Sequence, residues 1–379
     1  MSNVLIIYEV KDNTTDNNIS YFTTILSQIR TDCRVVKSSR VSANDINWCD
    51  VCIANRPNSP YSLSVVKALK RAGRFVVVSL DDDIINLPSE HPSYWRRRYT
   101  IKCLEIGDAL LSPNPLILED YCMKYHLRSI LTSSFVEEKT IKFAHKIKDI
   151  IKIVYPAGKD HVKCFNILIE PFFESLMAKY KGKIDVTFVG VEPKVKESEA
   201  VHFVKGMPYD DYLIYMKDNH FDIGIAPLED NPFCARKYYP KYLEYSRFGI
   251  AGIYSNVAPY TFILENMKNG VLVNDDPLKW EKALIKLIEN PQIIKDIVAN
   301  AQKDIRERFS LEHAVTMLRE GCPELENFHC DGNVTIFNYP RCSILNFKLR
   351  DFCSKAFYHF QHDGIKYCLH KINLNDEKC

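Results

Sequence analysis

The stretch DIGIAPLEDNPFCARKYYPKYLEYSRFGIAGIYS, residues 222–255, predicts a strand, a helix and a second strand in succession. Apolar runs occur at 221–228 and 250–255, and both are short and continuous, as in strands buried on both faces. Pro240 suits a first helical position and Gly249 suits a helix end, so we expect a helix over 240–248. A strand–helix–strand succession of this kind indicates a parallel sheet.

The same alternation of apolar runs and helical patterns fills most of the chain. It begins at residue 3, turns polar near 135–150, restarts at 151–158 and breaks down beyond about 320. We therefore predict an α/β protein with two Rossmann-like, doubly wound parallel-sheet domains facing a central cleft, plus a C-terminal extension. The predicted domains are 1–147 and 148–320, followed by a helical extension of uncertain role at 321–379.

Composition narrows the functional class. The chain has 379 residues and a formal net charge of +2, which is too balanced to predict nucleic-acid binding. No apolar run approaches the roughly 18–20 residues that span a bilayer. The opening MSNVLIIYEV reads as a strand and not as a signal peptide, because it lacks a basic region and a small-residue cleavage site.

The 13 cysteines are scattered and odd in number, which favours free thiols and a cytoplasmic location. Cys49 and Cys52 have C-x-x-C spacing within a predicted strand, and we expect buried thiols there. Redox or metal chemistry at this pair is the open alternative.

The cations of 234–250 suggest an anionic ligand. Lys241 lies in the first turn of the predicted helix, where free backbone N–H groups and the helix dipole already favour an anion. Glu244 follows three residues later on the same face, where its carboxylate can accept from a vicinal diol. Arg236 and Lys237 precede the helix and are placed for a second phosphate. The alternative is an ordinary helix with surface charges.

One strand later, Ser255 and Asn256 are predicted to cap a second helix start, with Pro259 near a first helical position. That helix start would supply a second anion site in the same crevice. Two anion sites and a diol acceptor predict a nucleoside diphosphate that carries a sugar.

The order of these motifs resembles the donor half of GT-B glycosyltransferases of the group 1, GT4-like retaining class. The resemblance covers residues 150–315 and rests on APL at 226–228, K-x-x-E at Lys241 and Glu244, S-x-x-x-P-Y at 255–260, N-G-x-L-V at 269–273 and Trp280. It implies a GT-B fold, with 148–320 binding the nucleotide sugar and 1–147 binding the acceptor. It also implies sugar transfer from a nucleotide-diphosphate sugar to a glycan, lipid-linked or other hydroxyl acceptor, with retention and without a metal or other cofactor.

The resemblance further implies roles for individual residues. Glu244 would hold the ribose hydroxyls, and Lys237 and Lys241 would stabilise the diphosphate. The implied donor-binding residues are Gly158, Lys159, Lys237, Glu244, Ser255, Val257, Ala258 and Tyr260, and the implied catalytic residues are Asp81, Asp82, His161, Arg236 and Lys241. A structural role for the loop residue His161 is the alternative.

The sequence departs from the family at two points. Arg236 stands eight positions before Glu244, where many members have a glutamate, and the segment 9–20 replaces a glycine-rich first loop. The identity of the sugar and of the acceptor is therefore not predicted.

Asp81, Asp82 and Asp83 end the predicted strand 74–80, so they face the presumed cleft. We expect them to bind acceptor hydroxyls or to handle a proton, and the segment 55–57 to line the same cleft. Loop capping and a divalent metal site are the alternatives. We expect no metal, because the cations of the other domain already supply the charge that a diphosphate needs.

Two segments combine cations with aromatic residues, namely 91–105 and the extension 321–379. Each is predicted to pack as helix. The alternative for 91–105 is contact with a lipid-phosphate acceptor or with the cytoplasmic membrane face, and the alternative for 321–379 is a peripheral membrane-contact surface. Metal binding is a further alternative for the extension. Two other functions stay open for the whole chain: a non-catalytic nucleotide-sugar-binding subunit of a polysaccharide assembly, and a nucleotide-sugar epimerase or hydrolase.

Overall fold

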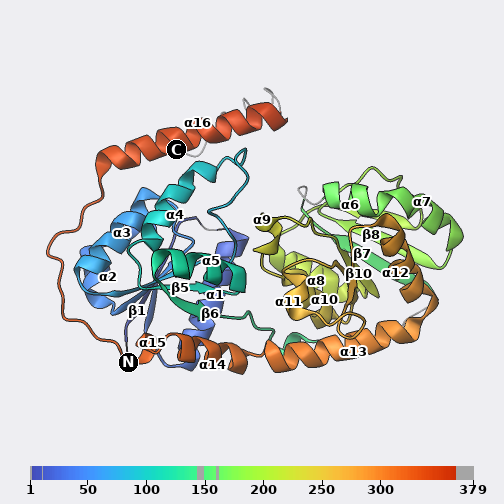
Figure 1. The fold of residues 1–379 in the computed structure, drawn as a ribbon, viewed down its shortest axis with the longest axis horizontal. Helices are drawn as coiled ribbons and strands as arrows, with labels where there is room; N and C mark the ends of the chain where they lie inside the picture. Colours follow the sequence, from blue (N-terminus) through green and yellow to red (C-terminus); the bar gives the residue numbers. More distant parts are fainter. Residues whose placement is uncertain (1, 11, 143–148, 159–161, 364–379) are drawn as a thin grey trace. The chain divides into compact units, whose positions relative to one another are not determined.

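The computed structural model describes residues 2–10, 12–142, 149–158 and 162–363 (Figure 1). The chain divides into two compact units. Unit 1 comprises Met1–Thr132 and Val315–Cys379, and unit 2 comprises Ser133–Ala314. The sequence-based boundaries lay instead at 147/148 and 320/321, because nothing local shows that the end of the chain returns to the first unit.

Unit 1 contains a six-stranded parallel sheet in the order β2-β1-β3-β4-β5-β6. Its strands are β1 Val4–Tyr8, β2 Cys33–Lys37, β3 Val51–Asn55, β4 Phe75–Ser79, β5 Ala109–Ser112 and β6 Arg128–Leu131. The helices between them are α1 Asn13–Gln28, α2 Ala43–Trp48, α3 Pro60–Arg71, α4 Arg97–Leu104 and α5 Pro115–Tyr125. Because β1 lies between β2 and β3, the strand order reverses there, and such a switch point is where open α/β sheets bind ligands.

Unit 2 repeats this architecture with the order β12-β11-β10-β7-β8-β9, again all parallel. Its strands are β7 Ile151–Pro156, β8 Ile184–Val189, β9 Val201–Val204, β10 Ile223–Ala226, β11 Ala251–Ser255 and β12 Val271–Val273. The helices include α6 Val162–Leu168, α7 Glu170–Lys179, α8 Tyr209–Asn219, α9 Pro232–Ala235, α10 Pro240–Phe248, α11 Tyr260–Ile263, α12 Pro277–Glu289 and α13 Pro291–Arg308. Its switch point lies between β7 and β10.

The two doubly wound sheets confirm the predicted α/β class. Helices α6 and α7 are separate and meet at Ile169, just before Pro171 in the first turn of α7. Strand β9 is an edge strand that is only partly buried. Trp280 is fully buried in the second core.

Cys49 and Cys52 are fully buried, as predicted. Burial raises the pKa of Cys49 to about 12 and that of Cys52 well above its usual value, so both stay protonated. The cysteines that the structure describes are free thiols.

The end of the chain packs on unit 1 through α14 Leu311–Gly321, α15 Glu324–Asn327, the segment 328–340 and α16 Arg341–Asp363 (Figure 1). Arg74, only 2% exposed, anchors this segment by donating to the carbonyls of Cys330, Gly332 and Asn47. The Tyr339 hydroxyl donates to the carbonyls of Ser38 and Val41 at 2.6 and 3.0 Å. The Arg74 guanidinium thus donates to backbone carbonyls from two distant parts of the chain, the loop near Asn47 and the segment 328–340.

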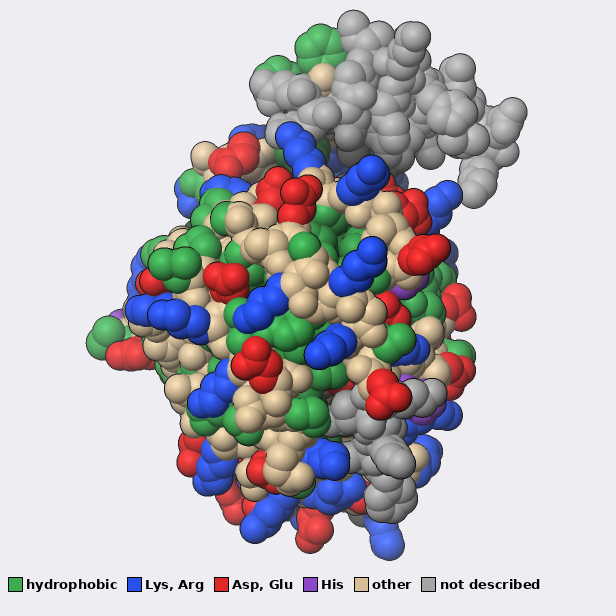
Figure 2. Space-filling model, turned by 90° about the vertical axis from the view of Figure 1, so that its right-hand side faces the viewer, with side chains coloured by type: hydrophobic (Ala, Val, Ile, Leu, Met, Phe, Trp, Pro, Cys, Tyr) green, Lys and Arg blue, Asp and Glu red, His purple; other side chains and the backbone are tan. Residues whose placement is uncertain are grey.

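The surface mixes both signs of charge. On the face shown in Figure 2, Lys and Arg side chains are interspersed with Asp and Glu side chains, as expected for a net charge of +2. Among the residues described, no helix combines the length and apolar composition needed to cross a bilayer.

We predict that Arg74→Met lowers the free energy of unfolding by about 3–5 kcal/mol, because buried carbonyls and the nearby Asp50 carboxylate lose their cation. Urea unfolding followed by circular dichroism measures this loss. Arg71→Met, which changes an exposed arginine three residues earlier, is the matched control and should change stability by less than about 0.5 kcal/mol. An equal effect of both substitutions would contradict the anchoring role.

Candidate functional site

The carboxyl edge of the unit 2 sheet gathers the predicted donor residues. All six strands are parallel, so the segments that follow them emerge at one edge. Segments 157–158, 227–239 and 256–259 follow β7, β10 and β11, which are neighbours around the switch point. The first turns of α8 and α10 begin at the same edge, after β9 and β10.

Helix α10 has the predicted limits, with Pro240 at its first position and Gly249 just beyond its end. Gly249 adopts the left-handed conformation, φ 70°, which a glycine enters without steric penalty. Lys241 and Glu244 share a face as expected, and the Lys241 Nζ lies 2.9 Å from Glu244 Oε2. The local geometry inferred from the spacing of these two residues is thus confirmed.

Glu244 is a buried carboxylate with partners on two helices. Its side chain is 6% exposed, whereas that of Lys241 is 26% exposed. Tyr212 of α8 donates its hydroxyl to Glu244 Oε2 at 2.9 Å, and Tyr209 donates to Oε1 at 3.3 Å. A buried charge requires such donors, so the carboxylate links the first turns of α8 and α10.

The phenols near Glu244 are held in their protonated, donating form. Burial raises the pKa of Tyr209, Tyr212 and Tyr260, and the negative charge of Glu244 raises each further. Sequence reasoning missed Tyr209 and Tyr212, because they come 35 and 32 residues before Glu244. Their i, i+3 spacing at a helix start was the one available signal.

The remaining cations lie close by in sequence and are half-buried. Arg236 ends α9 and donates from one guanidinium nitrogen to the Pro232 carbonyl at 2.8 Å. The Lys237 Nζ lies 5.3 Å from the centroid of the Phe233 ring. Gly158 is exposed two residues beyond β7, while Lys159 and His161 lie outside the described residues.

The predicted capping role of Ser255 and Asn256 is wrong. Ser255 is fully buried, and its Oγ accepts from the Leu228 N–H at 2.8 Å, which ties together the segments after β10 and β11. Asn256 donates its side-chain amide to Asn274 Oδ1 at 2.7 Å. Helix α11 begins after Pro259 without a side-chain cap and has only four residues, too few for the expected helix-dipole anion site.

Three of the predicted donor-site residues come within five positions after Ser255. Val257 and Ala258 are half-buried, and Tyr260 is buried in α11 with its ring centroid 4.8 Å from that of Tyr254. All three positions therefore come after β11 at this edge of the sheet, and the charge of Glu244 acts on Tyr260.

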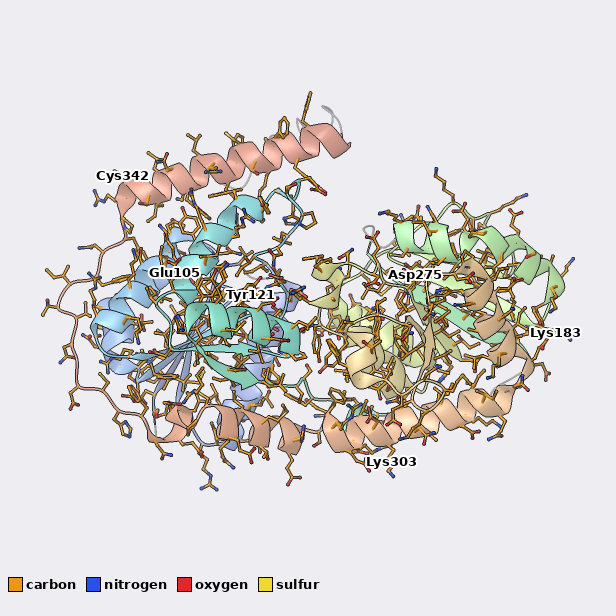
Figure 3. All side chains as sticks on the ribbon, viewed as in Figure 1. Glu105, Tyr121, Lys183, Asp275, Lys303 and Cys342 are labelled. Atoms are coloured by element: carbon orange, nitrogen blue, oxygen red, sulfur yellow. The ribbon has the colours of Figure 1, made fainter. Side chains whose placement is uncertain are left out.

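Carboxylates that were not predicted also occur at this edge. Glu229 and Asp230 follow β10, and Asp275 follows β12 (Figure 3). Glu229 Oε1 lies 2.9 Å from Lys163 Nζ at the start of α6. Burial, with the neighbouring charges of Asp230 and Glu229, raises the pKa of Asp275. The edge is thus mixed in charge.

In unit 1, the three consecutive aspartates separate into two roles. The Arg56 guanidinium contacts two of them: its Nε lies 3.1 Å from Asp81 Oδ1, and its Nη2 lies 3.4 Å from Asp82 Oδ2. Asp83 is fully buried and accepts from the Tyr121 hydroxyl (labelled in Figure 3) at 2.6 Å and from Asn86. Loop capping is therefore the role of Asp83, whereas Asp81 and Asp82 are half-buried and share one guanidinium.

Arg56 was missed as a partner of these aspartates. Burial works to lower its pKa, but the carboxylates of Asp81 and Asp82 outweigh that effect and the pKa is raised. Arg56 therefore supplies the positive charge that a metal ion would bring to the pair. Within the described part of the chain, no group of three or more His, Cys, Asp or Glu side chains has a geometry able to hold a metal.

Glu9 is a second residue that sequence reasoning missed. It follows β1, while Arg56 follows β3, so both residues come from the strand ends at the switch point of unit 1. Glu9 Oε1 accepts from Ser59 Oγ at 2.8 Å and from the Asn58 N–H at 3.4 Å. Burial raises the pKa of Glu9 despite these hydrogen bonds.

Comparison with known proteins gives one kind of match. No family model matches the chain, and no curated protein matches its sequence. Solved structures do match. Anabaena HepE, solved in complex with UDP-glucose, is 15% identical with a TM-score of 0.61, over 86% of this chain and 99% of HepE.

Two further structures are similar. The sucrose-phosphate synthase from Thermosynechococcus elongatus is 12% identical with a TM-score of 0.61, over 86% of this chain and 99% of its own. S. aureus TarM is 14% identical with a TM-score of 0.53, over 73% of this chain and 55% of TarM. These are GT-B glycosyltransferases, and at such identities the likeness establishes the fold alone. The predicted GT-B fold is thereby confirmed.

We predict that Glu9 makes stability fall with rising pH, because the folded state binds its proton more tightly than the unfolded state does. Its contribution is fully present below the ordinary glutamate pKa of about 4.3 and is lost as pH rises through the higher pKa of the folded state. Glu9→Gln keeps an acceptor for Ser59 but cannot ionise. The stability of the variant relative to the native chain, measured by urea unfolding, should therefore increase between pH 4 and neutrality. A difference that does not change with pH would contradict this role.

Proposed function

We propose that the chain is a glycosyltransferase that moves a sugar from a nucleotide-diphosphate sugar to a hydroxyl of a glycan or lipid-linked acceptor. The observation that carries this proposal is the buried Glu244 beside the half-exposed Lys241, in the first turn of a helix at the carboxyl edge of a GT-B unit. A carboxylate suited to a vicinal diol and a cation suited to a phosphate are the two groups that a nucleoside diphosphate requires.

The hydrogen bonds of Glu244 suggest how such a donor would be taken up. Two carboxylate oxygens offer about four acceptor positions, and Tyr209, Tyr212 and Lys241 occupy three of them. The two tyrosines are fixed by burial, but Lys241 has a flexible stem that reaches the surface. In the proposed bound state Lys241 turns to the diphosphate, and the ribose hydroxyls take its place on Glu244.

The chemistry follows from charge. As the bond from the sugar to the diphosphate breaks, negative charge grows on the leaving group, and Arg236, Lys237, Lys241 and the start of α10 stabilise it. We propose that attack occurs on the face from which the diphosphate leaves, so that configuration is retained without a metal. We place the acceptor at the switch point of unit 1, where Asp81, Asp82 and Glu9 provide hydrogen-bond acceptors.

The second candidate function is a nucleotide-sugar hydrolase or epimerase. The observation that favours this function is the group of acidic residues at the donor edge, Glu229, Asp230 and Asp275. A carboxylate can activate water as well as a sugar hydroxyl. A binding subunit without turnover would use the same donor contacts.

We predict that a nucleotide sugar raises the unfolding temperature and that Glu244→Ala removes most of that rise. UDP-glucose is the first ligand to test, because HepE was solved with it, followed by GDP-, ADP- and CMP-sugars. A ligand at 100 times its Kd adds about 2.7 kcal/mol. Losing a hydrogen bond to a charged group weakens binding by about 1.5–3 kcal/mol, or roughly 10–150-fold.

The controls separate binding from folding. Glu244→Ala also leaves two buried tyrosine hydroxyls without their acceptor, so the ligand-induced rise and not the absolute unfolding temperature is compared. Lys241→Met should weaken the response, whereas Lys303→Met, in which an exposed lysine of α13 is changed (Figure 3), should preserve it. No response to any nucleotide sugar, or a full response of Glu244→Ala, would contradict the proposed donor site.

We further predict that release of nucleoside diphosphate requires an acceptor. The native chain is incubated with the donor identified above, alone and with a lipid or glycan extract, and products are separated by chromatography. Acceptor-dependent release supports transfer, and equal release without acceptor identifies a hydrolase instead. An isomerised donor identifies an epimerase, and binding without any turnover identifies a subunit that only binds.

A further inference from the structure

Helix α16 is attached to unit 1 along one face. Phe347, 8% exposed, packs with its ring centroid 5.2 Å from that of Trp95 and 5.7 Å from that of Tyr99. Asp351 accepts from Arg96 Nε at 2.9 Å, and Ser354 donates to the Pro92 carbonyl at 2.8 Å. Trp95 and Tyr99 of the segment 91–105 thus pack against α16. This agrees with the prediction that the aromatic residues of that segment pack within the protein.

The opposite face of α16 is apolar and exposed. Leu345, Leu349, Phe352 and Phe360 are 72%, 62%, 60% and 53% exposed. Their spacing of three, four or eight residues aligns them on one side of the helix, about half a turn from Phe347. Figure 3 shows the side chains along α16, whose first turn is marked by the label of Cys342. A helix packed on a globular unit normally turns polar residues to water. An exposed apolar stripe of this length therefore indicates an interaction surface.

Cations border the stripe. Arg341 and Lys348 are exposed, and helical spacing places them on its side of α16. Arg350 and Lys355 are also exposed, but the Arg350 guanidinium lies 4.9 Å from the centroid of the Trp95 ring, and Lys355 Nζ lies 2.9 Å from Asp351. Asp351 is the only acidic residue in the sequence 341–358, and it also accepts from Arg96 of unit 1. Within 341–358, the outer half of α16 therefore presents a run of apolar side chains with positive charges at one edge and no negative charge.

We propose that this outer face of α16 is a docking surface for an anionic lipid bilayer. Apolar side chains enter the acyl boundary while bordering lysines and arginines reach the headgroups, which is the arrangement of an interfacial helix. Charge favours a bilayer over a second copy of the chain, because two identical faces meeting across a twofold axis would bring their cations together. The proposal does not depend on the donor site, which lies on unit 2.

Vesicle co-sedimentation of the full chain tests the surface. The probes are phosphatidylcholine vesicles and vesicles in which part of the phosphatidylcholine is replaced by phosphatidylglycerol. The native chain should sediment with the anionic vesicles and much less with the neutral ones, and added salt should reduce binding. Each cation near an anionic surface contributes about 1 kcal/mol, so Arg341→Gln with Lys348→Gln should weaken binding roughly 30-fold.

The apolar stripe is tested separately. Leu349→Ser with Phe352→Ser should abolish sedimentation without lowering the unfolding temperature, because both side chains are already exposed. Ile214→Ser is the matched control, since Ile214 is a 57% exposed apolar residue in the helix α8 of unit 2, and it should sediment like the native chain.

Three outcomes would overturn the proposal: no sedimentation with either vesicle, equal sedimentation of the stripe variant, or equal binding to neutral and anionic vesicles. A dimer in analytical ultracentrifugation that Leu349→Ser with Phe352→Ser dissolves, without vesicle binding, would instead assign the face to a second copy. Donor binding measured on the same variants should be unchanged. Failure of the bilayer proposal would therefore not count against the proposed glycosyltransferase function, which is tested separately.

Discussion

The buried charge of Glu244 is the constraint on which the proposed donor site depends. A carboxylate with 6% exposure is unstable in a protein interior unless donors surround it, and Tyr209, Tyr212 and Lys241 are those donors. They come from the first turns of two helices, so the sheet must deliver both turns to one edge. A parallel sheet does this, because every helix start follows the carboxyl end of a strand. The Glu244 carboxylate therefore depends on the fold for its donors, and its hydrogen bonds in turn connect α8 with α10.

The switch point of unit 1 carries the complementary arrangement. There a single guanidinium, that of Arg56, lies beside two half-buried carboxylates, Asp81 and Asp82, and Glu9 lies nearby on the adjacent strand. In unit 2 one carboxylate gathers hydroxyl and ammonium donors, and in unit 1 one cation gathers carboxylates. At each switch point, charged side chains are thus already paired with groups of opposite charge.

The C-terminal segment shows how one element serves two environments. Its segment 328–340 is tied to unit 1 by backbone carbonyls that Arg74 and Tyr339 hold. Its last described helix then packs Phe347 inward and leaves Leu345 and Leu349 exposed. Inward packing positions the helix, and the exposed apolar outer face is what makes a bilayer the proposed partner.

Sequence by itself determined the features that depend on neighbouring residues. The limits of α10 follow from Pro240 and Gly249, the contact between Lys241 and Glu244 follows from helical spacing, and the two parallel sheets follow from the alternation of apolar runs and helices. Only the tertiary structure decided which distant residues meet: Tyr212 with Glu244, Arg56 with Asp81, Ser255 with the Leu228 N–H, and Arg74 with Cys330. The physical reason is that hydrogen bonds and ion pairs act over a few ångströms, while these partners are separated by 25 to 256 residues whose path no local pattern encodes.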